Sequence, residues 1–170
     1  MSNKILVVSP HPDDETLGCG GTIFKHKSEK NKLYWIIMTK MSEHNYSSKS
    51  INNRNIEIKK VANKYKFEKV YNLDYKASEL ENYKKNDIID NLKKIIVNIK
   101  PSILYLPFPN DAHSDHRITY ESFIPFSKSF RYNFIKKIRI YETLSETEQV
   151  FFQNISFKPN LFIDIQKYIK

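Results

Sequence analysis

Short apolar runs alternate with amphipathic stretches along the chain, and the apolar runs predict the strands of a sheet. The first two runs, at residues 4–9 and 33–39, are continuously apolar in their middles. Runs of this length and type are typical of strands that are covered on both faces. Further strand-like stretches follow at residues 67–73, 103–107, 136–142 and 161–165.

Apolar residues recur at helical spacing between the strands. Ile58, Ala62 and Tyr65 predict a helix over residues 53–65. A second helix is predicted to end before Pro101, which cannot continue it. Its apolar stripe consists of Ile88, Leu92, Ile95, Ile96 and Ile99. The polar stretch 40–53 is long for a connection and predicts a functional loop. Strands that alternate with helices predict right-handed βαβ units, and therefore an α/β fold with a mostly parallel sheet.

The composition fits one globular domain that spans residues 1–170. Hydrophobic residues make up 40% of the chain and aromatic residues 14%, which is typical of a chain that buries a core. The single cysteine, Cys19, excludes an internal disulfide, so we expect a reducing location, the cytoplasm. The sequence shows no signal-peptide pattern and no stretch of roughly 18 apolar residues that would predict a membrane span.

The net charge of +9 raises the question of a nucleic-acid partner. Lys accounts for 24 of the 28 basic residues, and these lysines are scattered along the chain. Nucleic-acid surfaces cluster their basic residues and favour Arg. We therefore interpret the excess charge as a solvated surface and expect no nucleic-acid partner, although an attraction for anionic substrates is compatible with it.

A cluster of chemistry-bearing residues follows the first predicted strand. Residues 10–15 are Pro-His-Pro-Asp-Asp-Glu, so one imidazole and three carboxylates stand within five residues. The prolines stop regular strand pairing because they have no backbone N–H to donate. Burying this much negative charge is costly unless a cation or a substrate compensates it. The pattern therefore indicates a metal site.

A second cluster follows the strand predicted at 103–107. His113 and His116 lie three residues apart, with Asp115 between them. If a helix begins near Ser114, its first turn directs both imidazoles to roughly one side. Ligands of a parallel α/β sheet bind outside the carboxyl ends of the strands, and both clusters lie at such ends. The two clusters would meet if these two strands were neighbours in the sheet.

Together the two clusters fit a mononuclear zinc hydrolase. Catalytic zinc takes three protein ligands from His, Asp and Glu and keeps one position for water. His11, Asp14 and His116 would supply these three ligands. Because adjacent side chains diverge, Asp13 stays free to accept a proton from the attacking water as general base.

The other polar residues of the second cluster complete this hypothesis. His113 is placed to act as general acid and to stabilise the oxyanion. Asp115 is placed to hold one of the imidazoles in the required tautomer. Each cluster alone is as compatible with a turn or a helix start as with function. Their joint position at the ends of two apolar strands favours a site.

Other notable residues are expected to lie outside this site. His26 and His44 stand in polar segments and are expected to be exposed. Cys19 would bind zinc well as a thiolate, but between glycine-containing turns it is expected to be a small packed side chain. The three glycines of the chain, at 18, 20 and 21, predict close packing of the backbone against a strand where a helix begins.

Two motifs carry a resemblance to a known family. Residues 10–22, in which Thr-Leu-Gly-Cys-Gly-Gly-Thr follows the acidic cluster, resemble the opening motif of the LmbE-like deacetylases. This family includes the PIG-L N-acetylglucosaminyl-phosphatidylinositol deacetylases. The stretch His113-Ser114-Asp115-His116 is similar to the second motif of the family. The spacing of the motifs and the order of the strands are similar too, so the resemblance covers most of the chain.

The resemblance implies a Rossmann-like three-layer α/β sandwich with the site at the C-terminal ends of the strands. It also implies the zinc ligands and catalytic roles given above, and the removal of an N-acetyl group from a GlcNAc-containing glycoside or a related amino sugar. Arg54, with Glu57, is similar to an Arg-x-x-Glu stretch in which the Arg faces the substrate. Family members usually extend beyond 170 residues, in a part that helps to close the substrate pocket.

Three alternatives stay open at this point. A metal-dependent phosphoesterase would use Mg²⁺ or a metal pair, whereas two ligating histidines favour zinc. A metal-dependent hydrolase of another amide or ester would keep the same site. A non-catalytic sugar- or metal-binding relative would have no need of Asp13, whose presence with His113 favours an enzyme. The expected partner is a small amino-sugar conjugate, and a homo-oligomer is left open.

Overall fold

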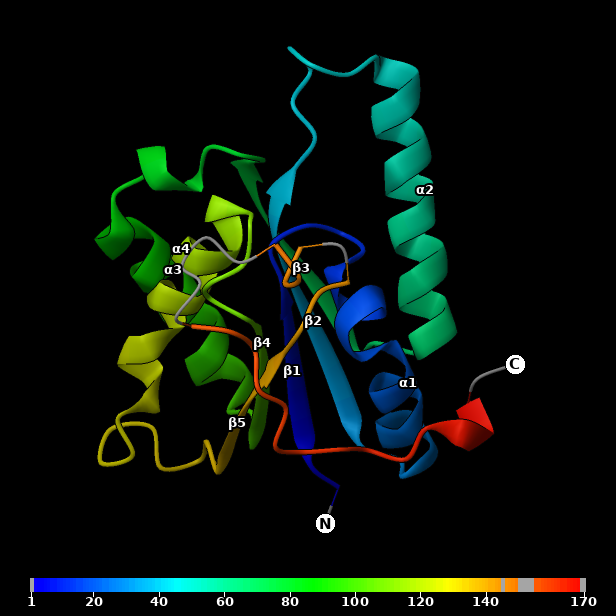
Figure 1. Cartoon of the computed structure of the whole chain (residues 1–170), viewed down its shortest axis with the longest axis vertical. Helices are drawn as coiled ribbons and strands as arrows, with labels where there is room; N and C mark the ends of the chain where they lie inside the picture. The colour runs from blue at the N-terminus through cyan, green and yellow to red at the C-terminus, as the bar shows by residue number, and fades with distance from the viewer. Residues whose placement is uncertain (1, 145, 150–154, 169–170) are drawn as a thin grey trace.

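A five-stranded sheet lies between two layers of helices in the computed structural model, which describes residues 2–144, 146–149 and 155–168 (Figure 1). The strands are β1, Lys4–Ser9; β2, Lys32–Lys40; β3, Lys69–Lys76; β4, Ile103–Pro107; and β5, Lys137–Tyr141. Their order is β3-β2-β1-β4-β5, and every neighbouring pair is parallel. The predicted Rossmann-like α/β fold is confirmed, with a sheet that is parallel throughout these strands.

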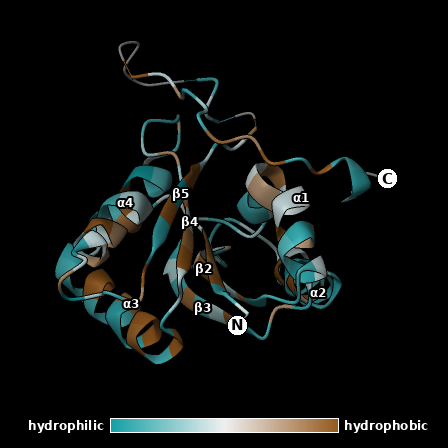
Figure 2. Cartoon of the chain, turned by 90° about the horizontal axis from the view of Figure 1, so that it is seen from below, coloured by the Kyte–Doolittle hydropathy of each residue, from teal (hydrophilic) through white to brown (hydrophobic). Residues whose placement is uncertain are grey.

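Helices cover both faces of the sheet (Figure 2). On one face lie α1, Asp14–Ser28, and α2, Ser48–Tyr65. On the other face lie α3, Lys85–Ile99, and α4, Ser114–Phe123. Short 3₁₀ turns are found at Leu80–Asn82, Ile124–Ser127 and Gln166–Tyr168. No helix within the described ranges is long and apolar enough to cross a membrane.

The sequence of β1 is apolar without alternation because both faces of the strand are buried. Leu6 and Val8 pack into the core under α3 and α4, whereas Ile5 and Val7 pack into the core under α1. All four side chains are fully buried. Burying a side chain of this size contributes about 1.5–3 kcal/mol, so both faces of the strand hold the sheet in place.

The predicted apolar stripe forms the buried face of α3. Ile88, Leu92 and Ile96 have no exposed surface, and Ile99 keeps only 3%. These residues belong to the larger of the two core clusters, between the sheet and the helices α3 and α4. The helix ends before Pro101, as predicted, because proline lacks the N–H that the next helical turn would need.

The helix α2 begins earlier than predicted, at Ser48 instead of residue 53. The Ser47 hydroxyl accepts a hydrogen bond from the backbone N–H of Ser50 at 3.1 Å and so caps the helix. The polar stretch after β2 therefore becomes helix rather than loop, and only residues 41–47 connect the two elements. Tyr65 alone is fully buried in α2, whose N-terminal half extends past the carboxyl edge of the sheet (Figure 1).

The prediction of a strand at 161–165 is wrong. Residues 155–165 form neither helix nor strand and cross β5 towards α1 (Figure 1). Side chains anchor the segment in place of a ladder of backbone hydrogen bonds: Ile165 packs on Gly21, and the hydroxyl groups of Tyr168 and Ser28 lie 2.7 Å apart. Phe162 is 82% exposed, so the apolar sequence of this segment does not reflect a buried strand.

Candidate active site

The pairing of β1 with β4 brings the two sequence clusters together. In the register of this pair, Ile5 lies opposite Ile103 and Val7 opposite Tyr105, so both strands end at the same edge of the sheet. The loops that follow them carry residues 10–13 and 108–113, and each loop leads into a helix. The helices α1 and α4 thus start beside each other at this edge, with the candidate residues in and before their first turns.

His11, Asp14 and His116 converge at this edge. Their ligand atoms all lie within 4.8 Å of one another. Asp14 Oδ2 lies 3.4 Å from His11 Nδ1 and 3.4 Å from His116 Nε2. Asp14 and His116 are buried, with 3% and 1% of their surface exposed. The structure therefore places the three predicted metal ligands in one group, in which Asp14 and His116 are buried and His11 is partly exposed.

The orientation of His116 is set by Asp111. The Asp111 carboxylate lies 2.6 Å from His116 Nδ1 and accepts its hydrogen, so in the neutral ring, the form that binds a metal, the lone pair is on Nε2. That nitrogen has no hydrogen-bond partner among the described residues, although it is buried and faces Asp14. A buried lone pair that faces a carboxylate oxygen fits a shared cation. Asp111 was missed by the sequence analysis, because its role depends on a contact that only the folded loop creates.

The orientation of His11 is set in the same way by Asp115. His11 Nε2 lies 3.0 Å from Asp115 Oδ2, so the other ring nitrogen faces Asp14. Asp115 is fully buried and also accepts hydrogen bonds from the backbone N–H groups of Ser78 and Leu80, at 2.7 and 3.1 Å. Both of its oxygens are therefore occupied. This arrangement fits an orienting residue better than a metal ligand.

The surrounding carboxylates make this group attract positive charge. Burial lowers the pKa of His11, but hydrogen bonds to Asp115 and Asp14 outweigh it and raise that pKa to about 9. The pKa of His116 rises to about 10, since Asp111 and Asp14 outweigh burial in the same way. Burial raises the pKa of Asp14, but the two imidazoles outweigh it and hold that pKa well below its usual range. A divalent ion would supply the charge that these groups favour, and a His-Asp-His donor set suits zinc.

Asp13 stands apart from the three converging side chains. Its carboxylate is 49% exposed, and its nearest charged partner is Arg54, with Nη1 3.7 Å from Asp13 Oδ2. Arg54 Nη1 also donates to the carbonyl oxygen of Pro12 at 3.1 Å. Burial, and then the charge of Asp14, raise the pKa of Asp13 despite this arginine. A carboxylate with a raised pKa is a better proton acceptor, which fits the predicted role of general base.

His113 caps the helix α4. Its Nδ1 accepts the backbone N–H of Asp115 at 3.1 Å, so in the neutral ring the hydrogen is on Nε2. The His113 ring lies against that of His11, with a centroid distance of 4.3 Å. Burial, followed by the charge of His11, lowers the pKa of His113. The geometry offers Nε2–H as a hydrogen-bond donor beside the candidate metal ligands.

Glu15, the last acid of the first cluster, turns away from these residues. It is 1% exposed and accepts hydrogen bonds from the hydroxyl groups of Ser9, at 3.3 Å, and Thr16, at 2.5 Å. The Ser9 hydroxyl in turn accepts the indole N–H of Trp35 at 2.8 Å. Burial raises the pKa of Glu15 to about 7. This carboxyl group therefore joins α1 to the sheet and does not face the candidate ligands.

The expectation that His26 is exposed is wrong. It retains only 8% of its surface, and its ring nitrogens lie 2.8 Å from the Tyr105 hydroxyl and 3.1 Å from Asn31 Nδ2. Cys19, Ile23 and His26 follow one another at helical spacing on the buried face of α1, a signal that the lysines around His26 obscured. Cys19 is a packed side chain, as expected, and burial raises the pKa of its thiol.

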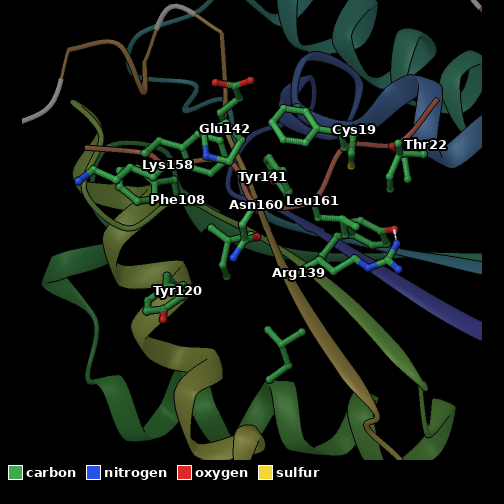
Figure 3. A pocket seen from close by; sticks show the side chains of 18 of the residues that line it. Cys19, Thr22, Phe108, Tyr120, Arg139, Tyr141, Glu142, Lys158, Asn160 and Leu161 are labelled. Carbon is green, nitrogen blue, oxygen red and sulfur yellow. Dashed lines mark hydrogen bonds between the residues drawn. The ribbon is translucent and has the colours of Figure 1, made fainter. Parts of the chain in front are cut away.

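Two cavities lie near the sheet. The larger, of about 690 Å³, lies along β5 and is lined on one side by residues of the segment 157–165 (Figure 3). Phe108, Tyr120 and Tyr141 line it, but none of the candidate ligands or catalytic residues does. The smaller cavity, of about 270 Å³, includes Asp13 and Arg54 in its wall. Of these two cavities, the smaller one adjoins the candidate site.

The fold and the site define an α/β protein with a candidate metal centre at the carboxyl edge of a parallel sheet. Comparison with known families makes this assignment specific. The family model described as PIG-L, GlcNAc-PI de-N-acetylase, matches residues 6–126, a range that contains both motifs. The chain belongs to the PIG-L family, and the resemblance seen in the sequence is confirmed.

Individual relatives support this assignment. A diacetylchitobiose deacetylase of Thermococcus kodakarensis is 26% identical over 126 residues, which cover 67% of this chain and 45% of that protein. The structure of the N,N'-diacetylchitobiose deacetylase of Pyrococcus horikoshii, in complex with its inhibitor MPG, is 26% identical with a TM-score of 0.73. That match covers 98% of this chain and 65% of the other. This chain thus spans less than two thirds of the length of either relative.

The same fold also supports other chemistry. The 4-carboxy-2-hydroxymuconate hydratase GalB of Pseudomonas putida KT2440 is 20% identical, with a TM-score of 0.72 over 98% of this chain and 74% of that one. At this identity the likeness concerns the fold alone. The reaction of this chain must therefore be argued from its own side chains.

Proposed function

We propose that this chain is a zinc-dependent N-deacetylase that acts on GlcNAc-containing glycosides or related amino-sugar conjugates. One observation carries the proposal: two imidazole nitrogens and a carboxylate oxygen converge in a largely buried group, while the half-exposed carboxylate of Asp13 lies outside that group, beside Arg54. The diacetylchitobiose deacetylases among the relatives support the choice of an N-acetyl sugar.

His11, Asp14 and His116 would hold the zinc ion. When bound, the ion supplies Lewis acidity for the acyl carbonyl and for the attacking water. Asp111 and Asp115 fix the two imidazoles from behind, since each accepts the ring N–H that points away from Asp14. Carboxylates in this position raise the basicity of ligating imidazoles and hold their rings in orientation.

The proton transfers fall to Asp13 and His113. Asp13 takes a proton from the attacking water, whose oxygen forms a bond to the acyl carbon. His113 would donate its Nε2–H to the developing oxyanion, and we place the amine side of the scissile bond towards it. The C–N bond then breaks as His113 gives the departing nitrogen a proton, and the proton that Asp13 took from the water replaces it on His113, so the products are acetate and the free amino sugar.

Other residues and properties follow from the same proposal. Arg54 lies beside Asp13 and is placed to contact the substrate from the side of α2. The single cysteine supports a reducing compartment such as the cytoplasm. In this proposal, residues 1–170 form one catalytic domain.

Acetate release from a panel of N-acetylglucosamine conjugates, measured with the zinc-loaded protein, tests the proposal. We expect Asp13→Asn to reduce turnover by about 10²–10⁴-fold, the contribution typical of a general base. Its zinc content, measured by elemental analysis, should stay at the wild-type level. Asp90→Asn, an exposed carboxylate on α3, serves as the matched control and should retain wild-type turnover.

Three outcomes would contradict the proposal. Zinc-loaded wild-type protein that releases no acetate from any conjugate would favour a non-catalytic binding relative. Full turnover in Asp13→Asn would show that Asp13 is not the general base. Retention of stoichiometric zinc in His116→Ala would show that the ligand set is wrong, because that variant lacks one of only three protein ligands.

A further inference from the structure

An apolar crevice lies between α1 and α2, beside the candidate base. Its volume is about 270 Å³. Trp35 of β2, Leu17 of α1 and Ile58 of α2 contribute apolar walls, and Asp13 and Arg54 lie at its polar side. Leu17 is 46% exposed, which is high for a large apolar side chain next to a candidate site. The crevice is therefore apolar surface that adjoins the candidate catalytic residues.

The charged side chains at the rim of the crevice already pair with one another. Arg54 Nη1 donates to the Pro12 carbonyl oxygen at 3.1 Å and lies 3.5 Å from Glu57 Oε2 and 3.7 Å from Asp13 Oδ2. The guanidinium is thus held between two carboxylates. A ligand group inside the crevice meets mainly hydrocarbon, so the crevice suits an apolar group rather than a charged one.

The order of the strands places the crevice and His113 on opposite sides of the candidate site. β2 and β4 flank β1 on opposite sides. Trp35 belongs to β2, whereas His113 follows β4. In an amide, the carbonyl carbon carries the amine on one side and the acyl substituent on the other. With the amine towards His113, the acyl substituent points towards the β2 side, where Asp13 and the crevice lie.

We propose that this crevice binds the acyl substituent of the substrate, and that the chain hydrolyses N-acyl amino sugars with acyl groups longer than acetyl, up to about hexanoyl. This inference rests on the proposed amide hydrolysis. A water-sized group occupies about 30 Å³, so the methyl group of an acetyl fills only a small part of the crevice. A butyryl or hexanoyl chain would cover Leu17 and fill the space in front of Ile58.

A series of N-acetyl, N-butyryl and N-hexanoyl conjugates of one amino sugar tests the inference with the zinc-loaded protein. Each methylene that leaves water favours binding by about fourfold, so we expect kcat/KM to rise along the series. The variant Ile58→Phe, which narrows the crevice, should lower the ratio of hexanoyl to acetyl turnover. Ile56→Phe on the same helix, at a position that is 42% exposed and outside the crevice, should leave that ratio unchanged.

Fluorescence gives a second measurement that needs no turnover. Trp35 is the only tryptophan of the chain and lines the crevice. We expect the N-hexanoyl conjugate to change its emission in the wild type and in Ile56→Phe, with a much weaker change in Ile58→Phe. The N-acetyl conjugate should have little effect in any of the three proteins.

The outcomes separate this inference from the function on which it rests. Release of acetate with a fall of more than tenfold from acetyl to butyryl, and no change in Trp35 emission, would overturn the acyl crevice and leave the deacetylase intact. Failure to hydrolyse any conjugate would overturn the proposed function. In that case an emission change that Ile58→Phe abolishes would still support acyl binding in the crevice, and its absence would refute it.

Discussion

Replacing Gly18 with alanine tests how tightly α1 is pressed against the edge of the sheet. A Cβ at this position would lie 2.1 Å from Tyr141 Cδ2 and 2.7 Å from the carbonyl oxygen of Glu142. Favourable contacts between carbon atoms begin at about 3.5 Å, so the helix or β5 would have to move by more than about 1 Å. Tyr141 is held in place, because it is 5% exposed and its hydroxyl donates to the Val8 carbonyl oxygen at 2.7 Å.

The magnitude follows from two opposing effects. Overpacking a well-packed site costs about 1–3 kcal/mol and occasionally more. Alanine gains up to about 1 kcal/mol over glycine inside a helix, but the backbone of Cys19, directly after Gly18, is not helical, which limits this gain. We therefore expect the free energy of unfolding to fall by about 2 kcal/mol. For a chain of this length, that lowers Tm by about 4–8 °C.

Urea denaturation followed by circular dichroism, together with a thermal melt, measures this loss. Gly21→Ala is the matched control, since its Cβ would meet the Ile165 side chain, with Cδ1 at 2.5 Å. Ile165 lies outside the backbone ladder of the sheet, so its side chain can yield more easily than the buried Tyr141, and we expect a change within about 1 kcal/mol. If Gly18→Ala unfolds at the same urea concentration as the wild type, the close contact does not constrain α1 and the reasoning is refuted.

Asp111 and His26 lead to two further predictions. One carboxylate oxygen of Asp111 accepts a hydrogen bond from His116 Nδ1, and the other accepts one from the backbone N–H of His113. The variant Asp111→Asn keeps only one of these acceptors. The affinity for zinc, measured by chelator competition, should therefore fall about 10–100-fold. Unchanged affinity would exclude this orienting role. Burial lowers the pKa of His26, so the unfolded state binds the proton more readily and stability falls as the pH drops below about 6.5. Urea titrations from pH 8 to 5 should show a smaller loss in His26→Gln than in the wild type or in the exposed control His44→Gln, and equal losses would contradict the assignment.

The three inner strands, β1, β2 and β4, could be predicted because each is buried on both faces and is therefore apolar along most of its length. The edge strands β3 and β5 are partly exposed and carry polar residues as well. The segment 161–165 has a similar composition but no place in the sheet, and its last residue, Ile165, packs on α1 instead. The start of α2 could not be found from apolar spacing, because a serine cap and not a buried stripe begins that helix. Hydrophobic pattern therefore predicts elements that packing creates and misses those that hydrogen bonds create.

The candidate site was predictable to a similar extent and for a similar reason. His11, Asp14 and His116 stand out because acids and imidazoles at the ends of apolar strands need an explanation. Asp111 carries no such signal, since an aspartate in a loop is ordinary and only the folded loop brings it to His116. The crevice beside Asp13 joins parts of β2, α1 and α2, so no single stretch of sequence could have revealed it.

The adjacency of β1 and β4 also has a consequence for how the protein folds. These strands pair although β2, β3 and the helices α1, α2 and α3 all lie between them in the chain. Contacts this distant in sequence form slowly, because a long loop must close before they can contribute. His116 can join His11 only after that closure, so high-affinity zinc capture would report completion of the sheet rather than the formation of its first half. Zinc present during refolding would then stabilise the native state by binding to it, and it would not accelerate the pairing of β1 with β4.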